Sequence, residues 1–209
     1  TAIRTGATSG LATKTLANKE PGVGAIFGTG VQAQHQVEAL VVAVGIKTFL
    51  VFSRSIESAQ SFCNLIQKMF GIEATAGKLE QLKKANVICT ATPSEKPLFD
   101  FEDISPGVHI NAVGSYKPEM QEVGSGVVRN ARVIVDSLEP CKAEAGDLIV
   151  PAKEGEWSLD MICGELGQAI QNKTVGRQRK SDVTLFKSVG NAIQDLALVN
   201  LIMEKVHSG

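Results

Sequence analysis

The chain has 209 residues, a formal net charge of −1 and 44% hydrophobic residues, enough material for one large or two small cores. Its near-neutral charge gives no reason to expect nucleic acid or an anionic membrane surface as a partner. No apolar run approaches the roughly 20 residues that span a bilayer, and the opening residues show no signal-peptide pattern.

The cysteines are scattered along the chain, at Cys63, Cys89, Cys141 and Cys163, without a C-x-x-C pair. The histidines do not cluster, so the sequence predicts no metal site. Scattered cysteines are typical of free thiols in a reducing compartment. We therefore expect a cytoplasmic protein.

The first half of the chain alternates between apolar runs and amphipathic stretches. In chain order, the predicted elements are a helix over 1–17, a strand over 23–27, a helix over 31–44, a strand over 48–52, a helix over 56–70, a short strand over 72–75 and a small helix over 78–85. Ser55 is placed to cap the helix that follows it, and Gly71 to end that helix.

The second half continues this alternation and then changes character. Strands are predicted within 86–92, 108–114 and 131–137, and from about residue 138 the pattern loosens, with a loop-rich stretch over 144–158. Val- and Ile-rich strands between helices predict a parallel sheet covered on both faces, which is an α/β fold of the Rossmann-like, doubly wound type. The chain closes with a strand and a long helix within 183–206.

The terminal helix carries an apolar stripe, with hydrophobic residues recurring at helical spacing: Val189, Ile193, Leu196, Val199 and Met203. A helix this apolar needs a partner surface. That surface could belong to the sheet domain itself or to a lobe outside this chain, and the sequence leaves both open.

The junction GAIFGTGVQAQ, residues 24–34, matches a dinucleotide-binding turn. Gly28 supplies the tight bend, Gly30 lets the backbone approach a pyrophosphate, and the small Ala33 allows the helix to pack on the strand. The N–H groups at the start of the helix would face the phosphates. The alternative is an ordinary strand-to-helix turn that uses glycine, but the second strand at the right distance favours nucleotide binding.

The end of the second strand indicates which dinucleotide is bound. Where NAD-binding domains commonly place Asp or Glu on the ribose diol, this chain has Ser53, Arg54 and Ser55. A guanidinium with two hydroxyls favours the 2′-phosphate of NADP(H). A solvated Arg54 is the alternative, and Glu57 keeps NAD(H) open. We predict that NADP(H) is preferred.

Four stretches, RTGATSGLATKTLA, GTGVQAQ, HINAVGS and TLFKSVGNAIQD, resemble in order and spacing the ornithine cyclodeaminase/mu-crystallin family, and the resemblance covers essentially the whole chain. It implies a Rossmann domain and a second lobe, built mainly from an N-terminal portion, that forms the dimer and much of the substrate pocket. We expect that portion to be missing and both terminal helices to belong to that lobe. Residues 1–20 would lead from it, 21–180 would form the NAD(P)-binding domain, and 181–209, a strand and a helix, would return toward it.

The resemblance also implies site residues. Arg4 matches the family's arginine that binds the substrate carboxylate, a role suited to a bidentate guanidinium, whereas without the motif it would be read as a solvated residue. Val189 is implied as a substrate contact. Besides the glycine turn and Ser53, Arg54 and Ser55, the implied cofactor contacts are Val31, Gln32, Thr90, Ala91, Thr92, Ala112, Val113, Gly114 and Ser188. Without the resemblance, residues 90–92 and 112–114 would be interpreted as plain strand ends, and Ser188 as a helix cap.

One position departs from the cyclodeaminases, which carry an Asp two residues after the glycine of NAVG. Here that residue is Tyr116, whose phenol is a poor base at neutral pH but can donate a proton. Tyr116 is therefore a candidate catalytic residue, with packing over the pocket mouth as the alternative. His35 and His109 are interpreted as surface or structural residues. Asp147 and Asp195 match family positions, where a cap or structural hydrogen bond explains each as well as chemistry does.

These observations predict an NADP(H)-dependent oxidoreductase that acts on the C–N bond of a small imino or amino acid by direct hydride transfer. A cyclic ketimine is the favoured substrate and an open-chain amino acid the next. Two alternatives stay open: an NAD-dependent ornithine cyclodeaminase, which Tyr116 and Ser53 disfavour, and a non-catalytic NADPH-binding protein resembling mu-crystallin. We expect the complete protein to be a homodimer, with no nucleic-acid or membrane partner.

Overall fold

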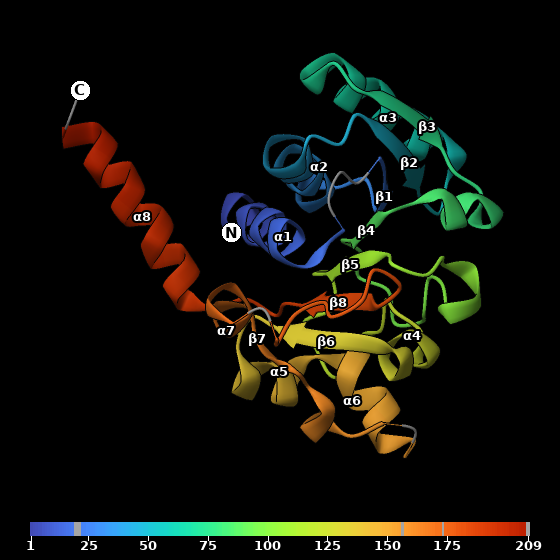
Figure 1. The fold of residues 1–209 in the computed structure, drawn as a ribbon. Coiled ribbons are helices and arrows are strands. Elements are labelled where there is room, and N and C mark those ends of the chain that lie inside the picture. Colours follow the sequence, from blue (N-terminus) through green and yellow to red (C-terminus); the bar gives the residue numbers. More distant parts are fainter. Residues whose placement is uncertain (19–21, 156, 173, 208–209) are drawn as a thin grey trace.

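A computed structural model describes residues 1–18, 22–155, 157–172 and 174–207 of the chain. Within them, parallel strands form one sheet in the order β3-β2-β1-β4-β5-β8-β6-β7 (Figure 1), which confirms the predicted Rossmann-like α/β fold. The strands are β1 (Val23–Phe27), β2 (Thr48–Phe52), β3 (Glu73–Ala76), β4 (Val87–Thr90), β5 (His109–Ala112), β6 (Ala131–Val135), β7 (Gly164–Glu165) and β8 (Val183–Lys187).

Helices cover both faces of this sheet. They are α1 (Ala2–Leu16), α2 (Val31–Val44), α3 (Ile56–Phe70), α4 (Ser125–Asn130), α5 (Leu138–Glu144), α6 (Gly146–Lys153), α7 (Leu166–Gln171) and α8 (Ala192–His207), with 3-10 turns η1 (Leu79–Lys84), η2 (Phe101–Asp103) and η3 (Leu159–Met161). Alternate strand residues enter different cores: Ile26 and Val51 pack with α2 and α3, whereas Ala25 and Leu50 belong to the core that includes Leu148 of α6. Burial on both faces is the reason for the nearly continuous apolar strands.

Helix α1 packs against α2 and extends the same layer. The approach is close, because a Cβ on Gly6 would lie 2.5 Å from the carbonyl oxygen of His35. Ala12 and Leu16 are fully buried in a cluster with Phe186 of β8. Helix α1 is therefore packed into the sheet domain. The predicted boundary between residues 20 and 21 lies outside the described residues.

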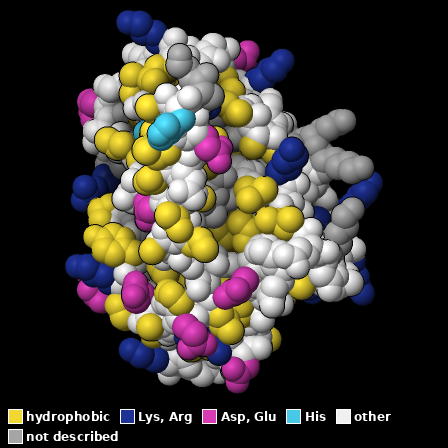
Figure 2. Space-filling view, turned by 90° about the vertical axis from the view of Figure 1, so that its left-hand side faces the viewer, with side chains coloured by type: hydrophobic (Ala, Val, Ile, Leu, Met, Phe, Trp, Pro, Cys, Tyr) yellow, Lys and Arg dark blue, Asp and Glu magenta, His cyan; other side chains and the backbone are white. Residues whose placement is uncertain are grey.

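The strand predicted to return toward a second lobe, β8, lies inside the sheet between β5 and β6. Phe186 pairs with Asn111 on one side and with Ile134 on the other. Among the described elements, α8 alone extends away from the body of the domain (Figure 1), and its hydrophobic side chains are exposed on the face seen in Figure 2. Val189, predicted to open the apolar stripe, precedes this helix, which begins at Ala192.

The region after residue 138 is more helical than predicted. The whole of α6 falls within the stretch 144–158, which the sequence predicts as loop-rich, and Pro151 lies inside this helix. Proline lacks the backbone N–H and disfavours helix interiors. Leu148 is fully buried in the core, and this packing overrides the local preference.

Candidate cofactor and substrate site

The sheet changes direction between β1 and β4. From β1 the chain builds outward to β2 and β3 and then crosses to β4 on the other side of β1. Ligands of open α/β sheets bind beyond the carboxyl ends of the strands at such a switch point. The turn that contains Gly28 and Gly30 directly follows β1 at this place.

Gly28 makes a bend that a side chain would block. Its φ is +107°, a region that L residues rarely adopt, and a Cβ there would lie 2.6 Å from the carbonyl oxygen of Ala91. The Gly28 N–H donates to the carbonyl oxygen of Phe52, at 2.9 Å. The turn therefore ties together the ends of β1, β2 and β4.

Gly30 differs because it borders open space. A Cβ at Gly30 would have no described atom within 4 Å. Gly30 caps α2 without a side-chain hydrogen bond, so the backbone N–H groups of the first turn remain available as donors. Ala33 is fully buried, as its packing role requires. Open space before uncapped N–H groups fits a diphosphate.

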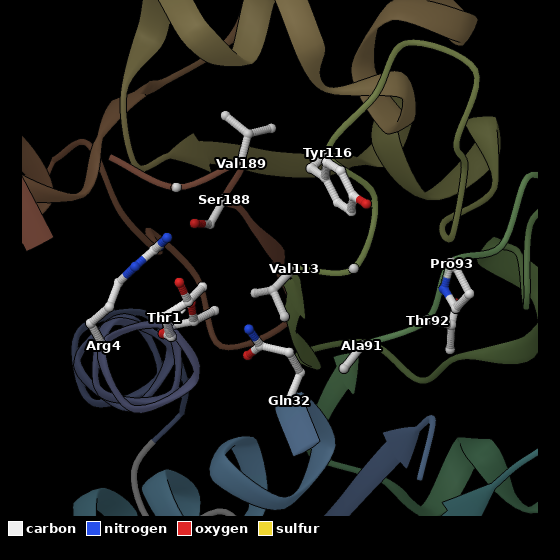
Figure 3. A pocket seen from close by; sticks show the side chains of 13 residues that line it. Thr1, Arg4, Gln32, Ala91, Thr92, Pro93, Val113, Tyr116, Ser188 and Val189 are labelled. Carbon is white, nitrogen blue, oxygen red and sulfur yellow. Dashed lines mark hydrogen bonds between the residues drawn. The ribbon is translucent and has the colours of Figure 1, made fainter. Parts of the chain in front are cut away.

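A cavity of about 420 Å³ adjoins this turn, with walls from α1, the start of α2 and the carboxyl ends of β4, β5 and β8 (Figure 3). This size suits a small-molecule ligand. The predicted site residues that line it are Arg4, Gln32, Ala91, Thr92, Val113, Gly114, Tyr116, Ser188 and Val189. Thr1, Thr5, Pro93 and Gly190 also line it and were not predicted. Thr1 and Thr5 flank Arg4 on one helix face, a spacing from which they could have been found.

Arg4 enters the cavity from α1 and is held by the first turn of α8. Its Nε donates to Asp195 Oδ1 at 3.2 Å, and its Nη1 donates to Gln194 Oε1 at 2.8 Å. The guanidinium lies against the backbone of Gly190, where a Cβ would be 2.9 Å from Nη1. Among the described residues, Nη2 has no hydrogen-bond partner. A carboxylate in the cavity would supply one.

Gln32 points into the cavity from the start of α2 (Figure 3). Its Oε1 is buried and finds no hydrogen-bond partner in the described part of the chain. An unsatisfied buried acceptor costs about 1–3 kcal/mol. This oxygen is therefore placed to accept a hydrogen bond from a ligand.

Ser188 is oriented by Asp136, a residue that the sequence patterns did not indicate. The Ser188 hydroxyl donates to Asp136 Oδ2 at 2.6 Å, and the Gly190 N–H donates to the same oxygen at 2.8 Å. Because α8 begins only at Ala192, Ser188 is not its cap. With its hydrogen engaged, the Ser188 oxygen can accept from a ligand in the cavity.

Tyr116 stands at the mouth of the cavity, on the loop after β5. The residue is 54% exposed, and Lys117 Nζ lies 5.9 Å from the centroid of its ring. Figure 3 places Tyr116 above Val113, on the opposite side of the cavity from Arg4. Tyr116 lines the cavity, and in Figure 3 its hydroxyl points away from Arg4.

A buried carboxylate lies directly behind the cavity wall, and no sequence pattern had indicated it. Glu122 accepts the backbone N–H groups of Thr92 (2.7 Å), Gly114 (2.7 Å) and Ser115 (3.0 Å). It also accepts the hydroxyls of Thr90 and Thr92, each at 2.9 Å. The ends of β4 and β5 are joined through this one side chain.

Asp147 and Lys187 complete the buried network. Asp147 Oδ1 accepts the backbone N–H of Glu122 (2.6 Å) and Val123 (3.0 Å), which agrees with a structural hydrogen-bonding role. Its Oδ2 accepts the Ser115 hydroxyl and lies 3.0 Å from Lys187 Nζ. Burial, and then the neighbouring Asp147 charge, raise the pKa of Glu122, while Lys187 opposes this shift.

Several predicted contacts do not reach the cavity. Thr90 and Ala112 are fully buried in strand ends, and the Thr90 hydroxyl is used by Glu122. These two are the last residues of β4 and β5, and the cavity lining begins one residue later, at Ala91 and Val113. Val31 is exposed beside the glycine turn.

The end of β2 forms a separate, exposed region. Ser55 caps α3 as predicted by accepting the Ser58 N–H at 3.2 Å, and its hydroxyl donates to Glu57 Oε2 at 2.7 Å. This hydrogen bond lowers the pKa of Glu57. Ser53 and Arg54 are exposed, and Arg54 forms no ion pair with any described residue. Glu57 lines a hollow of about 390 Å³ together with Thr29 of the glycine turn.

The histidines lie outside the cavity, as expected. His35 pairs with Glu38 on α2, at 2.9 Å. His109 is buried between Thr184 Oγ1 (2.9 Å) and Asn111 Oδ1 (3.1 Å). Burial, and then the Arg177 charge, lower the pKa of His109 to about 3.

The described residues contain no group of His, Cys, Asp and Glu that could hold a metal ion. The four cysteines are free thiols. In the same parts of the chain, the helices are too short or too polar to cross a membrane.

Sheet order, glycine turn and cavity together define a dinucleotide-binding domain of the Rossmann class. The model of the ornithine cyclodeaminase/mu-crystallin family matches residues 1–209, and the chain belongs to that family. It is 41% identical over 208 residues to a Delta(1)-pyrroline-2-carboxylate reductase from Bacillus cereus, covering 98% of this chain and 64% of that protein.

Solved structures of relatives have the same fold. The Thermococcus litoralis Delta(1)-pyrroline-2-carboxylate reductase in complex with NADH and L-proline has 36% identity and a TM-score of 0.93, over 99% of this chain and 65% of that one. An archaeal alanine dehydrogenase dimer with bound NAD has 32% identity and a TM-score of 0.92, over 99% and 64%. The chain thus spans slightly less than two thirds of the length of these relatives.

Proposed function

We propose that the protein containing this chain is an NADP(H)-dependent oxidoreductase that reduces the C=N bond of a small cyclic imino acid. The observation that carries this proposal is the single cavity that joins Gln32, beside the open glycine turn, to Arg4. One end of the cavity suits a dinucleotide and the other suits a carboxylate. Substrate and cofactor would therefore meet between them.

The relatives support this reaction and suggest a substrate class. The Bacillus cereus relative is a pyrroline-2-carboxylate reductase, and the Thermococcus litoralis structure holds NADH and L-proline. A five-membered ring with a carboxylate next to the C=N carbon is the substrate we favour. The alanine dehydrogenase relative makes an open-chain amino acid the second class to test.

Different residues of the chain would bind the diphosphate and the nicotinamide of the cofactor. The first-turn N–H groups of α2 would hold the diphosphate in front of Gly30, and Gln32 Oε1 would accept from the cofactor or substrate. Val113, Gly114 and Ser188 would flank the nicotinamide. When bound, the nicotinamide supplies the hydride that reduces the imine carbon.

The substrate would be held by charge and positioned by contact. Arg4 would bind the carboxylate through Nη2 while Asp195 and Gln194 fix the other side of the guanidinium. The Tyr116 hydroxyl would donate the proton that the imine nitrogen gains. Catalysis would then consist mainly of positioning.

The preference for NADP(H) rests on the end of β2. Ser53 and Arg54 are exposed and available to a 2′-phosphate, whereas the Ser55 hydroxyl is already used by Glu57. The Glu57 carboxylate would repel the 2′-phosphate of NADP(H), which would reduce the preference for NADP(H) over NAD(H) without removing it. We also propose a cytoplasmic homodimer, which the free thiols, the apolar exposed α8 and the archaeal dimer support.

Two measurements test the proposal. Titration of the chain with NADPH and NADH, followed by cofactor fluorescence, should give saturable binding that is tighter for NADPH. The protein should oxidise NADPH with pyrroline-2-carboxylate, and more slowly with pyruvate plus ammonia. Release of ammonia and proline from ornithine, without net change in cofactor absorbance, would instead identify a cyclodeaminase. Binding of NADPH without oxidation by any imine would identify a binding protein.

A further inference from the structure

We propose that Glu122 is a positioning residue that fixes the nicotinamide end of the cavity by holding the ends of β4 and β5 at one separation. This inference rests on the proposed function, because it assigns the wall formed by Thr92 and Gly114 to the nicotinamide half of the cofactor. Glu122 itself does not line the cavity. Its effect is exerted through the backbone in front of it.

The hydrogen bonds of Glu122 go to the residues that form the cavity wall. Thr92 and Gly114 both line the cavity, and the backbone N–H of each donates to Glu122 at 2.7 Å. One carboxylate oxygen serves the end of β4 and the other serves mainly the end of β5. The two strand ends therefore cannot separate without breaking charge-assisted bonds.

The carboxylate of Glu122 is closely packed against Gly114. A Cβ on Gly114 would overlap Glu122 Oε1 and the backbone of Thr92. Gly114 is thus pressed between the carboxylate and the neighbouring strand end. A change in the position of Glu122 is therefore expected to shift the cavity wall, because close-packed interiors transmit strain.

A second layer holds Glu122 from behind. Asp147 accepts its backbone N–H, and Lys187 donates to the Ser115 carbonyl (2.6 Å) and hydroxyl (2.7 Å). Lys187 ends β8 and is followed by the cavity residue Ser188. All three charged side chains are fully buried. The network thereby connects the three strand ends that bound the cavity.

Asp100 provides a matched comparison elsewhere in the chain. Its carboxylate also accepts backbone N–H groups, those of Phe101 (2.7 Å) and Val127 (3.1 Å). None of these residues lines the cavity. Asp100→Asn therefore perturbs a structural carboxylate without touching the proposed cofactor site.

The test compares two ligands on two variants. NADPH and ADP-ribose 2′-phosphate, which lacks the nicotinamide, are titrated against the wild-type chain, Glu122→Gln and Asp100→Asn. The amide introduced by Glu122→Gln would set a donor against backbone donors. We expect NADPH to bind Glu122→Gln about tenfold more weakly, with ADP-ribose 2′-phosphate changed by about twofold or less. Both ligands should bind Asp100→Asn as they bind the wild type.

Three outcomes would count against this account, and they are distinguishable. Unchanged NADPH affinity in Glu122→Gln overturns the positioning role, and an equal loss of both ligands reduces it to general structural support. If the wild-type chain binds neither ligand, the proposed function itself fails. Circular dichroism checks folding. Should Glu122→Gln not fold, Thr90→Val removes one buried donor to Glu122 and should weaken NADPH alone by about threefold.

Discussion

The two ends of the proposed cofactor site are built differently. At the ends of β4 and β5 the backbone of the wall residues Thr92 and Gly114 is held from behind by the buried carboxylate of Glu122. At β2 the corresponding groups are the exposed side chains of Ser53 and Arg54, beside the hydrogen-bonded pair Ser55 and Glu57. The end at β4 and β5 is held by buried hydrogen bonds between several strands. The end at β2 consists of exposed side chains that single substitutions can replace.

This difference separates two properties of the protein. The geometry in which hydride transfer would occur depends on groups that cannot move independently. Under the proposal, the choice between NADPH and NADH would depend on surface charges whose loss leaves the core untouched. Substitutions at the two ends should therefore have different signatures.

The largest effect is expected at the glycine turn that both ends share. Gly28→Ala places a Cβ 2.6 Å from the Ala91 carbonyl at φ +107°, so we expect dinucleotide binding to be lost and stability to fall by about 2 kcal/mol or more. Gly30→Ala is the matched control: with no described atom within 4 Å of the new Cβ, it should fold normally. Because that space is proposed for the diphosphate, it should still weaken binding. Urea unfolding and NADPH titration check both, and normal binding by Gly28→Ala would contradict the assignment.

The next effect concerns the substrate side. Arg4→Lys cannot reproduce a bidentate fork, and we expect kcat/KM for pyrroline-2-carboxylate to fall about 100-fold with NADPH affinity unchanged. Asp195→Asn keeps Arg4 but weakens its ion pair, and it should cost less, about fivefold. Steady-state kinetics separate the two variants. If Arg4→Lys retains full kcat/KM, Arg4 is not the carboxylate ligand.

A smaller and more selective effect is expected at β2. Arg54→Ala should weaken NADPH about tenfold while leaving NADH unchanged, because only the former carries the 2′-phosphate. Glu57→Gln should act in the opposite direction, strengthening NADPH by about twofold. Paired titrations measure the ratio. Equal losses for both cofactors in Arg54→Ala would remove this residue from cofactor selection.

The strand and helix pattern could be predicted from local signals, and the network behind the cavity could not. Apolar spacing and the Ser55 and Gly71 caps placed α3 at its observed bounds, and the third strand was off by one residue. Helix α6 was missed because Pro151 opposes its local preference. The motifs and the resemblance placed Arg4, Gln32 and Ser188 in one cavity.

Glu122 and Asp136 carry no motif of their own. Their roles arise only when residues distant in sequence converge, as when Thr90, Gly114 and Lys187 meet behind one wall. The same limit applies to Thr90 and Ala112, which end β4 and β5, because the cavity lining begins only at the residues that follow them. One sequence without tertiary contacts cannot supply that information.

The smallest effect is expected from His109, at the start of β5, and it concerns stability at acidic pH. Its folded pKa of about 3 lies below the unfolded value near 6.5, so the unfolded state binds more protons between these values. The contribution of neutral His109 to the free energy of unfolding should be fully present above about pH 6.5. It should decrease as the pH drops toward 3, with a slope approaching about 1.4 kcal/mol per pH unit. His109→Gln should reduce this slope without altering NADPH affinity at neutral pH. Denaturant unfolding across the acidic range measures it, and an unchanged slope would show that His109 is not the group responsible.

A crystal structure of the chain with NADPH tests the central claim most directly. The account predicts the diphosphate on the N–H groups that follow Gly30, the 2′-phosphate near Arg54, and the nicotinamide between Val113 and Ser188. Density for the nicotinamide outside this cavity, or a diphosphate that avoids the start of α2, would contradict it.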